Sequence, residues 1–128
     1  MPLRPPADVA AAAARGLELR ATKPPSERGG TEVGLARARD LSNRRVVSFD
    51  TVLRMARYFA RHLIDREGAT WSEQGKGWQA WQLWGGDPGV RWALTVMRRE
   101  APALYEAFIE TRTGRKLREQ FTSSGESQ

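Results

Sequence analysis

The sequence predicts a small all-α domain of about four to five helices with a Pro/Ala-rich N-terminal arm. Three observations lead to this prediction. The chain has 128 residues, a length that suits one domain. Apolar residues from Phe49 to Leu63 recur at steps of three and four, which places them on one face of a helix. Residues that commonly begin or end helices, such as Ser48, Gly85-Gly86 and Pro102, separate the apolar stretches.

The composition divides the chain into three expected parts. Residues 1–45 hold most of the prolines and most of the excess positive charge, so we expect a basic arm that is partly helical or flexible. Within it, short helices are expected over Ala7–Arg20 and Thr31–Leu41. Residues 46–121 are expected to form the compact helical domain, and 122–128 a loose polar tail.

The clearest expected helix covers residues 49–66. Ser48 suits its N-cap and Gly68 its end. On its apolar face lie residues such as Phe49 and Phe59. The opposite face carries the following residues: Arg54, Arg57, Tyr58, Arg61 and Asp65.

A tryptophan-rich helix is expected over residues 78–84 and is closed by the glycine pair that follows. Asp87 as N-cap and Pro88 in the first turn would start the next helix. Pro102 would start the last helix, which Gly114 is expected to interrupt.

The sequence offers few groups for catalysis. It has no cysteine and one histidine, His62, which excludes thiol chemistry, thiolate metal sites and a histidine pair for a metal. Asp65 lies three residues after His62 and is expected to hydrogen-bond it. Gly75-Lys76-Gly77 lacks the spacing of a phosphate-binding P-loop. We therefore expect a non-enzymatic protein without a metal or cofactor and, since no long apolar run is present, without a membrane partner.

Arginines give the strongest surface signal. The net charge is +6, and lysine occurs only at Lys23, Lys76 and Lys116. Guanidinium groups suit the planar, bidentate recognition of phosphate. Arginines of the helix over 49–66 and others shortly before it form a candidate phosphate-binding set: Arg37, Arg39, Arg44, Arg45, Arg54, Arg57 and Arg61. The alternative is the ordinary solvated face of an amphipathic helix.

Five tryptophans lie between residues 71 and 92. Trp81, Trp84 and Trp92 are expected in the core, because large aromatic side chains bury much area in a small domain. Trp71 and Trp78 lie near the glycine-rich loop and are candidates for an exposed aromatic contact with bases or with a protein.

Four stretches of the chain together resemble a small module of tailed-phage and prophage proteins. These are Gly29–Asn43, Ser48–His62, Gly75–Trp78 and Ala80–Asp87, in which Leu83-Trp84-Gly85-Gly86-Asp87 is the most specific block. The resemblance extends from Gly29 to Ala93, about half of the chain. It implies a phage setting, in the host cytoplasm or the virion, and it implies no reaction.

Two functions remain open on the sequence. The first is a nucleic-acid-binding module that contacts phosphates through the arginines. The second is a virion-associated or assembly protein that docks on other phage structural proteins, and capture of a host protein is a weaker third possibility.

Overall fold

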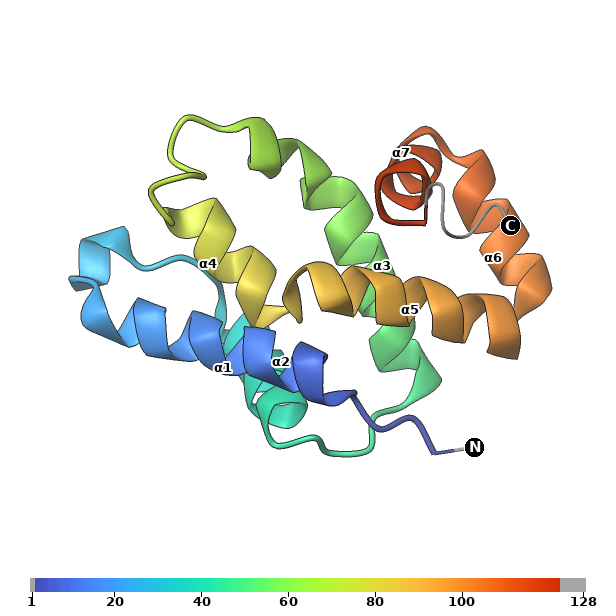
Figure 1. The fold of residues 1–128 in the computed structure, drawn as a ribbon, viewed down its shortest axis with the longest axis horizontal. Helices are drawn as coiled ribbons and strands as arrows, with labels where there is room; N and C mark the ends of the chain where they lie inside the picture. Colours follow the sequence, from blue (N-terminus) through green and yellow to red (C-terminus); the bar gives the residue numbers. More distant parts are fainter. Residues whose placement is uncertain (1, 123–128) are drawn as a thin grey trace.

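The protein is described by a computed structural model that covers residues 2–122, and within them it is built from helices without a β-strand (Figure 1). Its α-helices are α1 (Ala7–Thr22), α2 (Glu32–Ser42), α3 (Phe49–His62), α4 (Lys76–Leu83), α5 (Gly86–Glu100), α6 (Pro102–Glu110) and α7 (Arg112–Phe121). Two 3₁₀-helices, Pro25–Glu27 and Leu63–Glu67, follow α1 and α3. None of the helices in the described range is long and apolar enough to cross a membrane.

The all-α class is confirmed, but the number of helices is larger than expected. The last expected helix is divided at Thr111, whose hydroxyl oxygen accepts from the backbone N–H of Gly114 at 3.1 Å and caps α7. The break therefore lies before Gly114 and not at it. Gly114 is still required there, because a Cβ at this position would overlap the carbonyl oxygen of Phe108. Of the expected tail 122–128, only Thr122 lies within the described residues.

Residues 1–45 are not an arm outside the core, which corrects the expected division at residue 45. α1 contacts α2, α4 and α5, and three of its side chains, Val9, Ala12 and Ala13, are fully buried. Figure 1 shows α1 lying across α2 and α4. A hydrophobic pattern reflects mainly large apolar side chains, whereas the alanines of α1 stabilise the fold by letting neighbouring helices approach closely. At Gly16 an added Cβ would lie 2.9 Å from the Cβ of Gln82.

The rest of the core forms around α3 and α5. Phe59 of α3 and Trp81 of α4 are fully buried, and their ring centroids lie 4.8 Å apart in an edge-to-face arrangement. Trp84 is also buried, as expected, and Trp92 is half-buried against the core. Large aromatic side chains from separate helices thus fill one common core.

The helix ends follow the sequence signals in most places. The Ser48 hydroxyl accepts from the backbone N–H of Thr51 at 3.1 Å, which confirms it as the N-cap of α3. α3 ends at His62, and a 3₁₀-helix continues to Glu67. Gly85 (φ 117°) and Gly86 (φ 64°) take the left-handed conformation that glycine favours, so the pair closes α4 as expected.

Asp87 is not the N-cap of α5, since Gly85 holds that place. The Asp87 carboxylate instead accepts from the indole N–H of Trp81 at 2.9 Å and from Arg66 at 2.6 Å. Its role is to satisfy a buried donor at the corner between α4 and α5.

Candidate nucleic-acid interface

Two of the three α3 arginines are exposed and unpaired. No carboxylate among residues 2–122 lies within ion-pair distance of Arg57 or Arg61. Arg54 is exposed too, but its guanidinium group pairs with Asp50 at 2.8 Å. An exposed pair of this kind contributes little free energy, so Arg54 can exchange its partner at small cost.

These arginines line a cleft of about 560 Å³ between α3 and the first residues of α2 and α4. Lys76 of α4 adds a fourth cation. Asp65 is the one carboxylate among the residues that line this cleft. The cleft therefore carries a strong excess of positive charge, and its concave shape concentrates that field.

A buried glutamine holds the two walls of the cleft together. Gln79 of α4 is fully buried, and its side-chain oxygen accepts from the backbone N–H of Gly29 at 2.8 Å. Its amide nitrogen donates to the carbonyl oxygens of Gln74 at 3.1 Å and Glu27 at 3.3 Å. Arg20 of α1 donates to the carbonyl oxygen of Gly29 at 2.7 Å. The chain leading into α2 is thus fixed against α4 next to the cleft.

Aromatic rings stack along the inner side of the cleft. The rings of Tyr58 and Trp84 stack with centroids 4.6 Å apart and planes 7° apart. The Tyr58 ring also stacks on His62, with centroids 4.5 Å apart. Tyr58 was expected on the outward face of α3 with the arginines, but only 6% of it is exposed, so that expectation is wrong. Trp84 from the end of α4 covers the ring.

The Tyr58 hydroxyl has no hydrogen-bond partner within the described residues, although the atom is buried. Burial raises the pKa of this hydroxyl well above its ordinary value, and the charge of Asp65 raises it further. The group therefore remains protonated and keeps its ability to donate. Next to it, the His62 Nδ1 lies 3.1 Å from a carboxylate oxygen of Asp65, so the expected pair is present.

The four arginines expected to assist from outside α3 do not line the cleft. The side chain of Arg37 is only 14% exposed and lies over the Trp84 ring at 5.5 Å. Arg44 donates from its Nε to the carbonyl oxygen of Pro5 at 2.8 Å, and Arg45 pairs with Asp40 at 3.6 Å. Arg39 is exposed on α2 away from the cleft lining. Sequence proximity overestimated this cluster, because folding brings Arg37 to the Trp84 ring, Arg44 to the Pro5 carbonyl oxygen and Arg45 to Asp40.

The two tryptophans expected to be exposed are both half-buried. Trp71 packs edge-on against Trp81 with ring centroids 5.7 Å apart, and Arg66 lies over it at 5.7 Å. Trp78 lies on α4 outside the lining of the cleft. Neither tryptophan provides an exposed aromatic surface in the cleft.

Sequence reasoning missed Lys76, Tyr58 and Trp84 as parts of the site. Lys76 stands in a glycine-rich stretch that lacks the spacing of a P-loop. No local signal identifies it, because the helix dipole disfavours a cation in the first turn of a helix, and only the fold brings the start of α4 to the cleft beside α3.

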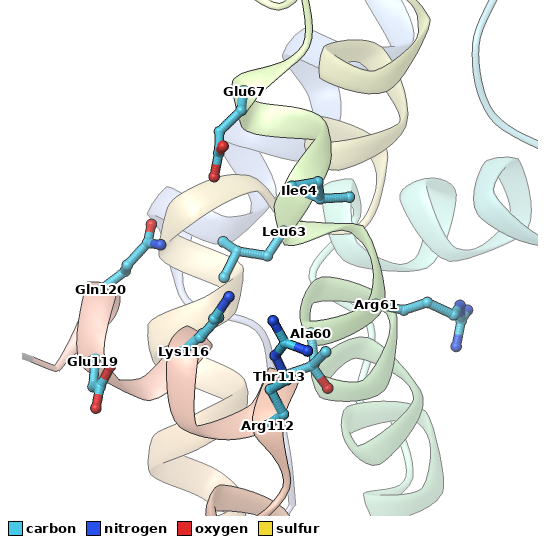
Figure 2. Close-up of a pocket in the computed structure, with 10 residues that line it drawn as sticks. All are labelled: Ala60, Arg61, Leu63, Ile64, Glu67, Arg112, Thr113, Lys116, Glu119 and Gln120. Atoms are coloured by element: carbon cyan, nitrogen blue, oxygen red, sulfur yellow. The ribbon is translucent and has the colours of Figure 1, made fainter.

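A second cleft of about 450 Å³ lies between the end of α3 and α7 (Figure 2). Arg112 and Lys116 of α7 reach toward Leu63, whereas the Arg61 side chain points away from them. Glu67 and Glu119 also line this cleft, so its charges are mixed. It is less suited to a polyanion than the cleft along α3.

The described residues contain no group of three or more histidine, aspartate or glutamate side chains arranged to hold a metal ion. Comparison with known proteins found no matching family model, no matching curated protein and no matching solved structure. The geometry of the clefts is therefore the basis for a functional argument.

Proposed function

We propose that this protein is a non-catalytic module that binds the phosphate backbone of nucleic acid through α3. One observation carries the proposal: Arg57 and Arg61 are exposed, have no carboxylate partner within the described residues, and share a cleft with Lys76. Unpaired guanidinium groups bind phosphate oxygens through two parallel N–H donors.

The charge balance supports the same function. The chain carries a net charge of +6, which attracts polyanions over a distance of about one Debye length, roughly 8 Å at physiological salt. Each phosphate that the cleft neutralises releases counterions, so the logarithm of affinity falls with the logarithm of salt concentration by about 0.9 per contact on duplex DNA. The proposed setting is the phage biology implied by the sequence resemblance.

The test is a salt series of binding measurements with a double variant, Arg57→Glu plus Arg61→Glu. This variant is expected to abolish the salt-sensitive mobility shift of nucleic acid at low salt while leaving the helical circular dichroism unchanged. A control variant, Arg15→Glu plus Arg91→Glu, removes the same charge at exposed positions of α1 and α5 outside the cleft.

The control separates a local site from a general charge effect. If binding depends on the cleft, the control variant retains most of the shift. Equal binding by wild type and the Arg57/Arg61 variant at low salt would refute the proposal. It would favour the alternative, in which the protein docks on phage structural proteins.

A further inference from the structure

The buried Tyr58 hydroxyl is the feature of the cleft that the fold itself does not explain. This hydroxyl has no acceptor within residues 2–122, and it belongs to a side chain that is only 6% exposed and that contributes to the lining of the cleft. A buried hydroxyl without a partner costs free energy, and phenylalanine would fill the same stacked position without that cost. A phosphate oxygen beside Arg61 would supply the missing acceptor.

The shape of the cleft favours a flexible strand over a duplex. A protein that reads the major groove of DNA, about 12 Å wide, inserts a protruding helix or ribbon into it. The C-terminal half of α3 instead lines a cleft together with the first residues of α2 and α4. A volume of about 560 Å³ lies within the range of small-molecule sites, roughly 300–1,000 Å³.

Aromatic groups in the cleft add a contact that suits an unpaired base. His62 is the partly exposed end of the ring stack that it forms with Tyr58 and Trp84, with 39% of its side chain accessible. Bases of single strands stack on such rings, which bases inside a duplex cannot do.

We propose that the cleft holds one nucleotide of a single-stranded nucleic acid and that the Tyr58 hydroxyl donates a hydrogen bond to its phosphate. Arg57 and Arg61 bind the same or the adjoining phosphate, and the base lies against His62. This inference rests on the proposed function and adds the form of nucleic acid and the residue that recognises it.

The experiment compares binding of oligothymidine, oligouridine and a duplex of matched length by fluorescence anisotropy, using wild type, Tyr58→Phe and Tyr105→Phe. Tyr105 is the other tyrosine of the chain; it is equally buried, but it lies in a different pocket. Tyr58→Phe keeps the ring and its stacking and removes only the hydroxyl. Thermal unfolding of each variant is measured alongside.

We expect a single strand to bind at least tenfold more tightly than the duplex at the same salt concentration. Tyr58→Phe is expected to weaken single-strand binding about ten- to a hundredfold, the effect of losing one hydrogen bond to a charged group, with a melting temperature equal to or above that of wild type. Tyr105→Phe is expected to bind as wild type does.

Two results would overturn the inference while leaving the proposed function intact: a duplex that binds as tightly as the single strand, or an unchanged affinity of Tyr58→Phe. If none of the three probes binds wild type at low salt, the proposed function itself fails, and the inference fails with it.

Discussion

Removal of the Asp87 carboxylate is expected to destabilise the protein more than its partial exposure suggests. The carboxylate accepts from Trp81 at 2.9 Å and from Arg66 at 2.6 Å, and Trp81 is fully buried. Asp87→Ala leaves the indole N–H without an acceptor, which costs about 1–3 kcal/mol. Loss of the pair with Arg66 adds at most about 1 kcal/mol, because both of its side chains are 30–40% exposed and solvent screens them.

The expected loss for Asp87→Ala is therefore about 1–4 kcal/mol in the free energy of unfolding. Asp87→Asn keeps an oxygen acceptor for Trp81 and loses only the charge, so its expected loss is about 1 kcal/mol. Urea denaturation followed by far-UV circular dichroism measures both. The reasoning would be refuted if the two variants lost the same free energy, or if Asp87→Ala lost less than about 0.5 kcal/mol, the ordinary effect of a surface substitution.

Two further predictions concern the fold. Gly114→Ala is expected to lower the free energy of unfolding by about 2–3 kcal/mol, because its Cβ would overlap the Phe108 carbonyl oxygen at the junction of α6 and α7; a melting temperature equal to that of wild type would contradict this. Deletion of residues 2–22 is expected to abolish cooperative thermal unfolding, since it removes the buried face of α1, and a cooperative transition in the shortened chain would show that α1 is dispensable.

The sequence predicted best those features that depend on neighbouring residues. The N-cap at Ser48, the helix closure at Gly85-Gly86 and the start of α6 at Pro102 each depend on backbone geometry within a few residues. The same holds for the exposed arginines at positions 57 and 61, which follow from helical spacing alone.

The predictions that were wrong concern features that depend on contacts between segments far apart in the chain. Alanine contributes little to a hydrophobic pattern, so the pattern places α1 in an arm, yet its small side chains are buried against α2, α4 and α5. Asp87 looked like an N-cap because its neighbours suit one. Only the folded structure brings Arg66, which precedes it by 21 residues, to its carboxylate.

Tyr58 shows why the polar face of a helix does not define a binding site. At about 100° per residue, it lies roughly 40° from Arg54 around α3 and so falls at the edge of the arginine face. The spacing therefore assigns it to solvent, as it does the arginines. Trp84, from the far end of α4, covers its ring, and the cleft forms beside that contact.

The first residues of α2 and α4 border α3 beside Tyr58, and together with the charged face of α3 they form the concave site. This arrangement depends on Gln79, whose hydrogen bonds join the segment before α2 to α4 across 50 residues of sequence. Periodicity identifies the cations but contains no information on that arrangement. For this reason the arginines alone predict only salt-dependent attraction to a polyanion, whereas the proposed preference for a single strand depends on the contacts of α4 with α2 and α3.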